Sequence, residues 1–219
     1  MTKADTKDKI LETASKLFAT SGFHGVSIRD IAKQADVNLA AVNYHFQNKD
    51  GLYAAVMLRS KKIFSEEVAA LDDGKISAFD MALGIQKVYK SHVNEFRNGF
   101  TLLLSGDGET VMKEVYSNSK EFGPPGINTF RKVLQREYPQ ASMAAMEWAC
   151  RAILSQMAHK TMLTHTPMFQ AVCDQAPGEY NMELFEVFIE ETINAILDRL
   201  TSKDQDLEAK IIARAKVSK

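Results

Sequence analysis

Apolar residues recur at helical spacing along most of this chain, and no other feature restricts its fold as strongly. One face of a helix over residues 7–20 would carry Ile10, Ala14, Leu17 and Phe18. The same spacing, with its capping and breaking residues, predicts further helices over residues 28–34, 39–45, 48–71, 77–96, 127–138, 142–164 and 182–200. No segment shows the alternation of apolar and polar residues that marks a strand. The sequence therefore predicts an all-α fold of about nine to ten helices.

Turn-forming residues divide this succession of helices into parts. Asp-Asp-Gly-Lys at residues 72–75 and Phe-Gly-Pro-Pro-Gly at residues 122–126 interrupt the helical spacing, and residues 98–126 are less regular than the rest. We expect three parts: a three-helix amino-terminal domain at residues 1–50, a helical body at 51–202 and a charged tail at 203–219.

Charge is distributed unevenly between the two ends of the chain. Residues 1–62 contain ten Lys or Arg and six Asp or Glu, a net charge of +4. The remaining residues contain seventeen basic and twenty-two acidic side chains, a net charge of −5, so that the two parts sum to −1. A basic end on an acidic body suggests a polyanionic partner, although a solvated helical surface could produce the same imbalance.

Other features of the composition point to a soluble protein. Residues 2–9 are charged and lack the apolar core of a secretory signal, and no apolar run approaches the roughly 18 residues of a membrane span. We therefore expect a cytoplasmic protein that binds no membrane. Cys150 and Cys173 lack the close spacing of a metal or redox pair, and lone thiols in such a protein are most often core residues.

Residues 28–46, with the sequence IRDIAKQADVNLAAVNYHF, have the pattern of a helix-turn-helix. Two short helices flank the break Asp36-Val37-Asn38, and apolar side chains such as Ile31 and Val42 can form the wedge that sets their crossing angle. The turn calls for a residue that tolerates positive φ, which Asp36 does better than most non-glycine residues. Taken alone, the same pattern also fits two short helices inside any helical bundle.

The residues on either side extend the pattern into a family signature. Ala14-Ser15-Lys16-Leu17-Phe18, Gly22-Phe23, Ser27 to Ala32, and Asn43-Tyr44-His45-Phe46-Gln47-Asn48-Lys49 followed by Leu52-Tyr53 occur in order. In this order and spacing, residues 7–57 resemble the amino-terminal part of the TetR/AcrR family of bacterial transcription regulators. The Val-Asn-Tyr-His-Phe form is similar to the antibiotic- and drug-responsive branch of that family. The resemblance implies a helix-turn-helix domain joined by a long helix to a helical ligand-binding and dimerisation domain.

The resemblance also implies roles in binding double-stranded operator DNA. Tyr44 and Lys49 match phosphate contacts of the family, and Ser27 and His45 have suitable chemistry for further ones. Such contacts position the protein without reading the base sequence. For base contacts we expect the start and exposed face of the second short helix, namely Asn38, Leu39, Ala40 and Asn43.

A short recognition helix reads few bases, so regulators of this type bind two half-sites as homodimers. The resemblance implies that two helices near the carboxyl end form the dimer interface. We expect its contacts to come from Ala149, Ile153, Gln156, Met157, Phe185, Phe188, Ile189, Ile193 and Ile196. The alternative is that these side chains form the core of a single subunit.

The resemblance further implies a pocket for a small-molecule effector, which the composition suggests to be apolar or aromatic. Aromatic and methionine side chains with a few polar groups suit such a pocket, although an ordinary core has the same composition. The candidate lining residues are Phe96, Phe100, Met112, Tyr116, Phe130, Trp148, His159 and Met162.

An enzyme of helical fold is the main alternative class. No Glu is followed by His three positions later, as helical di-metal sites require, and Ser105-Gly106-Asp107-Gly108 lacks the remainder of a phosphate loop. We expect no catalytic residue, metal or cofactor. The sequence therefore favours a transcription repressor released from DNA by its effector, with a helical adaptor that has lost DNA binding as the other alternative.

Overall fold

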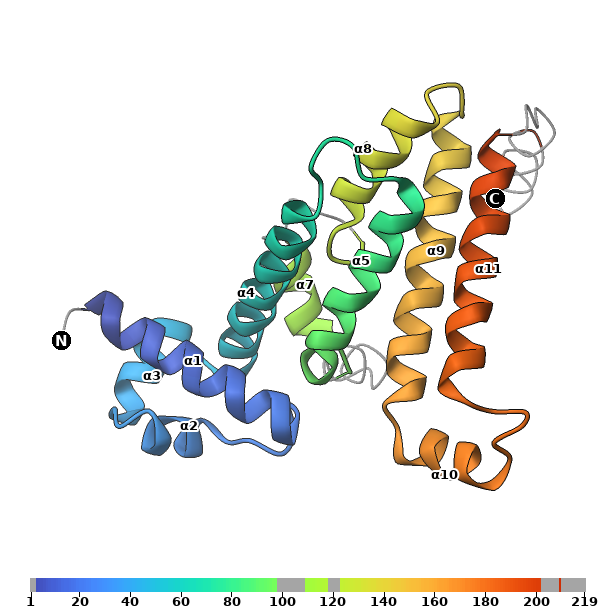
Figure 1. Ribbon diagram of the computed structural model, residues 1–219. Coiled ribbons are helices and arrows are strands. Elements are labelled where there is room, and N and C mark those ends of the chain that lie inside the picture. The colour runs from blue at the N-terminus through green and yellow to red at the C-terminus, as the bar shows by residue number, and fades with distance from the viewer. Residues whose placement is uncertain (1–2, 98–108, 118–122, 202–208, 210–219) are drawn as a thin grey trace. The chain divides into compact units, whose positions relative to one another are not determined.

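The computed structural model describes residues 3–97, 109–117 and 123–201 together with residue 209, and these residues form two compact units (Figure 1). The first unit comprises residues 1–63 and 92–122, and the second comprises residues 64–91 and 123–219. Every regular element among the described residues is a helix, as the sequence predicts. The expected division at residues 50/51 and 202/203 stays a prediction.

The first unit contains α1 (Lys3–Ser21), α2 (Ile28–Gln34), α3 (Leu39–Phe46), the first part of α4 (Lys49–Ala70) and α7 (Glu109–Ser117). Helices α1, α2 and α3 contact one another in all three pairs. Their shared core contains completely buried side chains from α1, α2 and α4, among them Ile10, Ile31 and Leu52. Val111 and Val115 of α7 are buried in the same core. This packing holds the two short helices against a scaffold that neither could form alone.

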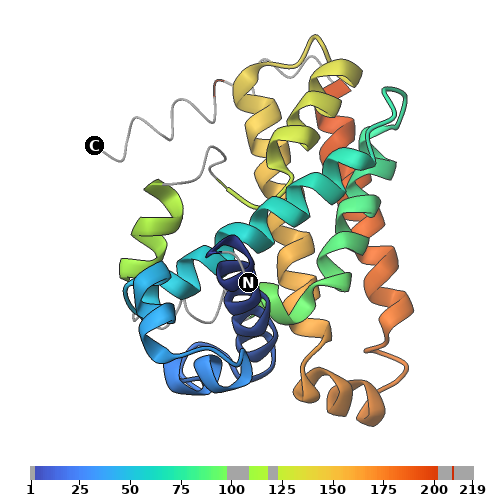
Figure 2. The same ribbon diagram turned by 90° about the vertical axis from the view of Figure 1, so that its left-hand side faces the viewer.

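The second unit contains the end of α4, α5 (Ala78–Ser91), α8 (Ile127–Glu137), α9 (Met143–Thr164), α10 (Pro167–Gln175) and α11 (Met182–Thr201). Helix α9 is its central element and contacts α5, α8, α10 and α11. Figures 1 and 2 both show α9 and α11 side by side, with α10 in the connection between them. Phe130, Ile153 and Leu154 are completely buried in this unit, so α8 and α9 supply much of its core.

Most expected helices are present, and their caps explain their limits. Ser27, Asn48 and Ser142 accept hydrogen bonds from backbone N–H groups in the first turns of α2, α4 and α9. Helix α5 ends at Ser91, but residues 93–97 are again helical after a break at His92, so the helix expected over residues 77–96 is interrupted and not shortened. The Ser91 hydroxyl donates to the carbonyl of Val88 at 2.9 Å. Such a bond back to the preceding turn competes with helix continuation.

Helix α10 is absent from the sequence-based prediction, which interprets Pro167 only as the residue after a helix. Pro167 is instead the first residue of α10, where its missing N–H is no loss. Thr166 caps the helix, and its side chain accepts a hydrogen bond from the N–H of Phe169 at 3.1 Å. The pair Thr-Pro is a helix-start signal that could have identified this element.

Among the described residues, no helix combines the length and the apolar character that a membrane-crossing segment needs.

Candidate nucleic-acid interface

Helix α3 has an exposed face that carries both apolar and polar side chains. Its buried residues are Val42 and Phe46, whereas Leu39, Ala40 and Asn43 are exposed, and Tyr44 is 64% exposed. The buried pair is spaced four residues apart, which turns one stripe of α3 to the core and leaves the rest outward. Three of the four expected base contacts therefore lie on one short exposed helix.

Asn38, the fourth expected base contact, is the N-cap of α3. Its side-chain oxygen accepts a hydrogen bond from the N–H of Ala41 at 2.7 Å. The residue is exposed, but its oxygen is already used in capping. Only the amide NH₂ group could then donate to a base without loss of the cap.

The turn between α2 and α3 has the conformation that the motif requires. Asp36 has φ of 49°, and the N–H of Val37 donates to the carbonyl of Ala32 at 3.0 Å. An Asp side chain tolerates this left-handed conformation better than most, which explains how the turn forms without glycine. The exposed turn connects the two helices at a fixed angle over the core residues Ile31 and Val42.

Ser27, an expected phosphate contact, forms a capping box at the start of α2. Its hydroxyl accepts from the N–H of Asp30 at 3.1 Å, and the Asp30 carboxylate accepts from the N–H of Ser27 at the same distance. The hydrogen bond from the Ser27 side chain lowers the pKa of Asp30, so the carboxylate remains charged beside Ser27. A phosphate approaching Ser27 would therefore meet an anion as well as a hydroxyl.

A tight turn centred on Gln47 joins α3 to α4. The N–H of Asn48 donates to the carbonyl of Phe46 at 2.8 Å, and Gln47 has φ of 66° and ψ of −56°. This is a γ-turn of the rare positive-φ form, which is strained for a residue with a side chain. The turn places His45 and Lys49 at the adjoining ends of two helices.

Lys49 is the first residue of α4, as the proposed phosphate contact requires. Asn48 caps the helix through its side-chain oxygen, which accepts from the N–H of Gly51 at 2.8 Å. The Lys49 ammonium lies 4.3 Å from the centre of the Phe23 ring. Burial lowers the pKa of Lys49, while the charge of Asp50 acts in the opposite direction. The half-buried cation thus lies at the amino-terminal end of a helix, where the helix dipole also attracts a phosphate.

Two exposed cations of α2 were not among the expected contacts. Arg29 and Lys33 are both exposed and lie on the helix that Ser27 caps. Their charge and their position next to the motif are a signal that sequence reasoning could have used.

The expected effector-pocket residues are distributed over both units. Phe96 is half-buried in the first unit, and in the second unit Phe130 is buried, Trp148 and Met162 are half-buried and His159 is exposed. Phe100 and the side chains of Met112 and Tyr116 lie outside the described part of the chain. The structure therefore brings no group of these residues around a described cavity, and the pocket assignment stays a prediction.

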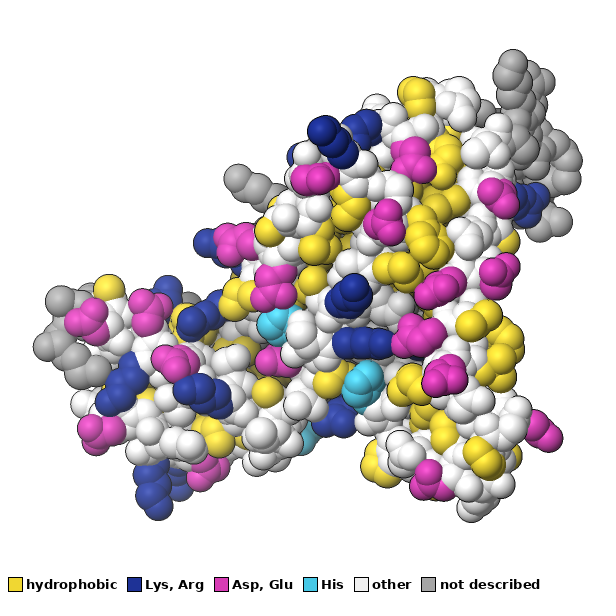
Figure 3. Space-filling model, in the orientation of Figure 1, with side chains coloured by type: hydrophobic (Ala, Val, Ile, Leu, Met, Phe, Trp, Pro, Cys, Tyr) yellow, Lys and Arg dark blue, Asp and Glu magenta, His cyan; other side chains and the backbone are white. Residues whose placement is uncertain are grey.

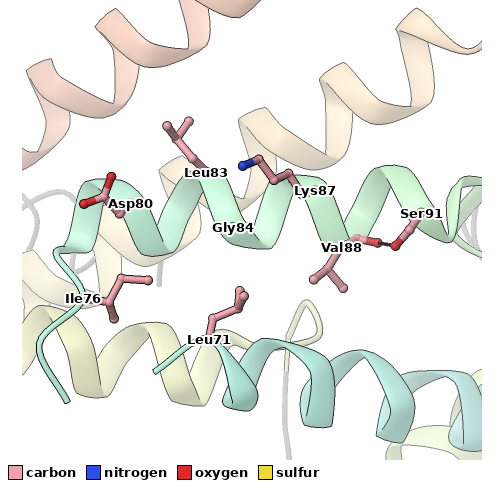
Figure 4. Close-up of a pocket in the computed structure, with 8 residues that line it drawn as sticks. All are labelled: Leu71, Ile76, Asp80, Leu83, Gly84, Lys87, Val88 and Ser91. Atoms are coloured by element: carbon pink, nitrogen blue, oxygen red, sulfur yellow. Dashed lines mark hydrogen bonds between the residues drawn. The ribbon is translucent and has the colours of Figure 1, made fainter. Parts of the chain in front are cut away.

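The second unit has a groove of about 540 Å³ along α5, and Figure 4 shows the side chains that line it. It lies where the chain after α4 passes α5, and a Cβ at Gly84 would approach Leu71 to 2.8 Å, so glycine permits this close contact. None of the expected pocket residues lines it. The lining consists of Leu71, Ile76, Asp80, Leu83, Gly84, Lys87, Val88 and Ser91.

The expected dimer contacts differ in accessibility. Gln156 is exposed, Phe185 is half-buried and Phe188 is 54% exposed. The other six are buried within this chain, and their assignment to a dimer interface stays a prediction: Ala149, Ile153, Met157, Ile189, Ile193 and Ile196. Figure 3 shows hydrophobic side chains on the surface over α10 and α11. The exposed apolar residues of this region are Met168, Tyr180, Met182, Val187 and Phe188.

Residues 10–56 match the model of the bacterial regulatory proteins of the tetR family. The chain is 56% identical over 50 residues to the "Probable HTH-type transcriptional regulator YttP" of Bacillus subtilis, covering 23% of this chain and 24% of that protein. It is 38% identical over 47 residues to the negative transcriptional regulator IcaR of the biofilm operon icaADBC of Staphylococcus epidermidis, covering 22% and 25%. The similarity thus spans about a quarter of either relative, and it involves the amino-terminal part of this chain.

Solved structures resemble the chain over most of its length. A transcriptional regulator from Rhodococcus sp. Rha1 has a TM-score of 0.62 at 16% identity, covering 88% of this chain and 96% of that one. A transcriptional regulator from Aquifex aeolicus VF5 has a TM-score of 0.56 at 19% identity, covering 87% and 99%. At such low identity these likenesses establish the fold of both parts of the chain and nothing finer.

Proposed function

We propose that this chain, whose residues 10–56 match the model of the tetR family of bacterial regulatory proteins, is a dimeric, DNA-binding transcription repressor. Relatives of the matched domain are named as regulators, not as enzymes, and IcaR is named as a negative regulator. Repression is the commoner outcome for a protein that occupies an operator through such a domain.

The observation that carries the proposal is the outward presentation of α3 directly before the start of α4. Tyr44 is 64% exposed and Asn43 is exposed, although both belong to a helix otherwise held in the core by Val42 and Phe46. Lys49 follows at the first position of the next helix. An exposed short helix next to a cation at the amino-terminal end of another helix is the arrangement that a helix-turn-helix needs.

Dimerisation follows from the geometry of DNA recognition. Helix α3 has eight residues and can contact only a few bases, so a second copy is needed to read a second half-site about 34 Å away. The apolar side chains exposed on α10 and α11, among them Val187 and Phe188, provide a surface that a second copy could cover. The charged tail at 203–219 has no role in this proposal.

Release by a small apolar effector is the regulatory part of the proposal. Helix α4 is continuous from Lys49 to Ala70, and the next residue, Leu71, lines the groove along α5. A ligand that binds more tightly to one of two conformations of α4 would shift the population toward that conformation. The spacing of the two recognition helices in the dimer would then change. The groove is apolar with Asp80 and Lys87 at its edge, so it suits a small apolar compound with a polar end.

The proposal is tested by selecting binding sites from random duplexes and measuring retardation of the selected duplex at stated salt. We expect a palindromic site with two half-sites and a dimer in analytical ultracentrifugation. Failure to retard any duplex at low salt would support an adaptor without DNA binding, and a monomer at working concentration would remove the two-site mechanism. A thermal-shift screen of apolar drugs and metabolites tests the effector, because a true effector raises Tm and lowers affinity for the selected duplex.

A further inference from the structure

The Lys49 ammonium lies over the aromatic ring of Phe23. The ring centre lies 4.3 Å from the Lys49 Nζ, well inside the roughly 6 Å range of a cation–π interaction. Phe23 belongs to the segment between α1 and α2, whereas Lys49 begins α4. Two segments 26 positions apart in sequence therefore meet at the cation expected to contact a DNA phosphate.

The ring of Phe23 is held in place by other aromatic side chains. Its centre lies 5.0 Å from that of Tyr53 in an edge-to-face arrangement and 6.3 Å from that of Phe18. Both partners are rigid core residues, because Tyr53 is 3% exposed and Phe18 is 2% exposed. Edge-to-face packing fixes the orientation of a ring as well as its position. Phe23 thus offers Lys49 a fixed surface.

A lysine side chain has four rotatable bonds and loses much conformational freedom when a phosphate immobilises its ammonium. A contact that already restricts the side chain in the free protein reduces this loss on binding. Lys7 of the same unit also lies over a ring, but its Nζ is 6.0 Å from the centre of Phe46, at the limit of the cation–π range. Lys49 approaches its ring more closely, at 4.3 Å, and it begins the helix that follows the helix-turn-helix.

We propose that Phe23 is a positioning residue for DNA binding, which holds the Lys49 ammonium at the start of α4 in readiness for a backbone phosphate. The inference rests on the proposed function, because it needs Lys49 to contact DNA. Phe23 itself touches no phosphate in this scheme and acts only through Lys49. It therefore raises affinity for every duplex equally and does not alter base preference.

Two substitutions of Phe23 separate the effect of its aromatic face from the effect of its apolar volume. Phe23→Leu keeps an apolar side chain without a π face, and Phe23→Tyr keeps the face. With a duplex of arbitrary sequence at low salt as the probe, we expect Phe23→Leu to weaken binding by about three- to tenfold and Phe23→Tyr to leave it nearly unchanged. Upfield ring-current shifts of the Lys49 side-chain protons, measured by NMR, should disappear in Phe23→Leu and persist in Phe23→Tyr.

A double-mutant cycle distinguishes positioning from folding. In a Lys49→Met background, Phe23→Leu should no longer change DNA affinity, although it should still lower Tm. If Phe23→Leu unfolds the domain, increasingly fluorinated phenylalanine at position 23 keeps the shape and weakens the π face, and affinity should fall with fluorination.

The outcomes bear on the two proposals differently. A wild-type protein that fails to bind the duplex at low salt overturns both the proposed function and the role of Phe23. If the wild type binds the duplex, either of two results overturns the role of Phe23 and leaves the proposed function intact. In the first, Phe23→Leu binds the duplex as tightly as the wild type does. In the second, Phe23→Leu weakens binding by the same factor in the Lys49→Met background as in the wild-type background.

Discussion

Lys160 of α9 donates a hydrogen bond to the carboxylate of Glu186 in α11, and with 2% of its surface exposed Lys160 has almost no access to water. Lys90 of α5 donates to the other carboxylate oxygen of Glu186 at 2.6 Å. Burial lowers the pKa of Lys160 despite its pairing with Glu186. One carboxylate thus compensates a buried cation and ties together the three helices α5, α9 and α11.

Glu186→Gln should destabilise the protein much more than Lys160→Met. The first change removes the carboxylate that is hydrogen-bonded to the buried ammonium of Lys160 and leaves only the weaker charge of Glu190, so it should lower the free energy of unfolding by about 2 kcal/mol. The second removes the buried charge and leaves Glu186 paired with Lys90, so its effect should stay within about 1 kcal/mol. Urea unfolding measures both changes in free energy, provided that the dependence of that free energy on urea concentration is the same in both variants as in the wild type. Equal losses in the two variants would contradict this account.

The same carboxylate predicts a pH dependence of stability. Burial by itself would raise the pKa of Glu186, but the hydrogen bonds and charges of Lys160 and Lys90 outweigh it and lower the pKa below 4.5. The folded state therefore favours the ionised form, and its stabilisation is present above the unfolded pKa and lost as pH falls through the folded one. The difference in unfolding free energy between wild type and Glu186→Gln should be constant down to about pH 5 and shrink below it. If the difference in unfolding free energy grew below pH 5 instead, folding would raise the pKa of Glu186, and this prediction would be wrong.

Gln47→Gly should stabilise the amino-terminal unit. Gln47 has φ of 66° in the γ-turn between α3 and α4, a conformation that costs a residue with a side chain more than it costs glycine. We expect the free energy of unfolding to rise by up to about 1 kcal/mol, reduced somewhat by the greater freedom of glycine in the unfolded chain. Gln47→Ala, which retains the strain, is the matched control and should bring no gain. Loss of stability in Gln47→Gly would show that the turn is relaxed.

Lys49→Ala should weaken binding to all duplexes and flatten the salt dependence. Loss of one phosphate contact lowers the slope of log affinity against log salt by about one unit. Lys132, an exposed residue of α8 in the second unit, provides a control, because Lys132→Ala should leave the slope unchanged. Fluorescence anisotropy over a range of salt concentrations measures both slopes. An unchanged slope in Lys49→Ala would remove Lys49 from the DNA contacts.

Asn43→Ala should change sequence preference and not general affinity. Asn43 is exposed on α3, and an amide can bond an adenine at two positions, which is worth about 1–3 kcal/mol against a wrong base. The variant should lose discrimination at one position of each half-site and keep the salt slope of the wild type. Lys49→Ala provides the comparison, since it should weaken all sequences alike. Full retention of sequence preference in Asn43→Ala would assign base reading to another residue.

The sequence by itself determined the helical class, the order of the helices around the motif and the exposed face of α3. These features depend on interactions between residues close in the chain: the spacing of Val42 and Phe46, the caps Ser27 and Asn48, and the tolerance of Asp36 for positive φ. Local spacing and local hydrogen bonds are visible in a sequence, so α2 was predicted with both of its limits. The start of α10 was equally local, at Thr166 and Pro167, but its signal was not used.

Only the tertiary structure decided which side chains become neighbours. The residues close to Phe23 in the sequence do not indicate that its ring contacts Lys49. Likewise, the residues close to Lys160 in the sequence do not indicate that Lys160 and Lys90 both bind Glu186. Tertiary packing likewise decided that Ile153 and Ile193, apolar on long helices, are buried within the subunit while Phe188 remains exposed. An apolar periodicity shows which face of a helix avoids water, but whether that face meets the same chain or a second copy depends on long-range packing.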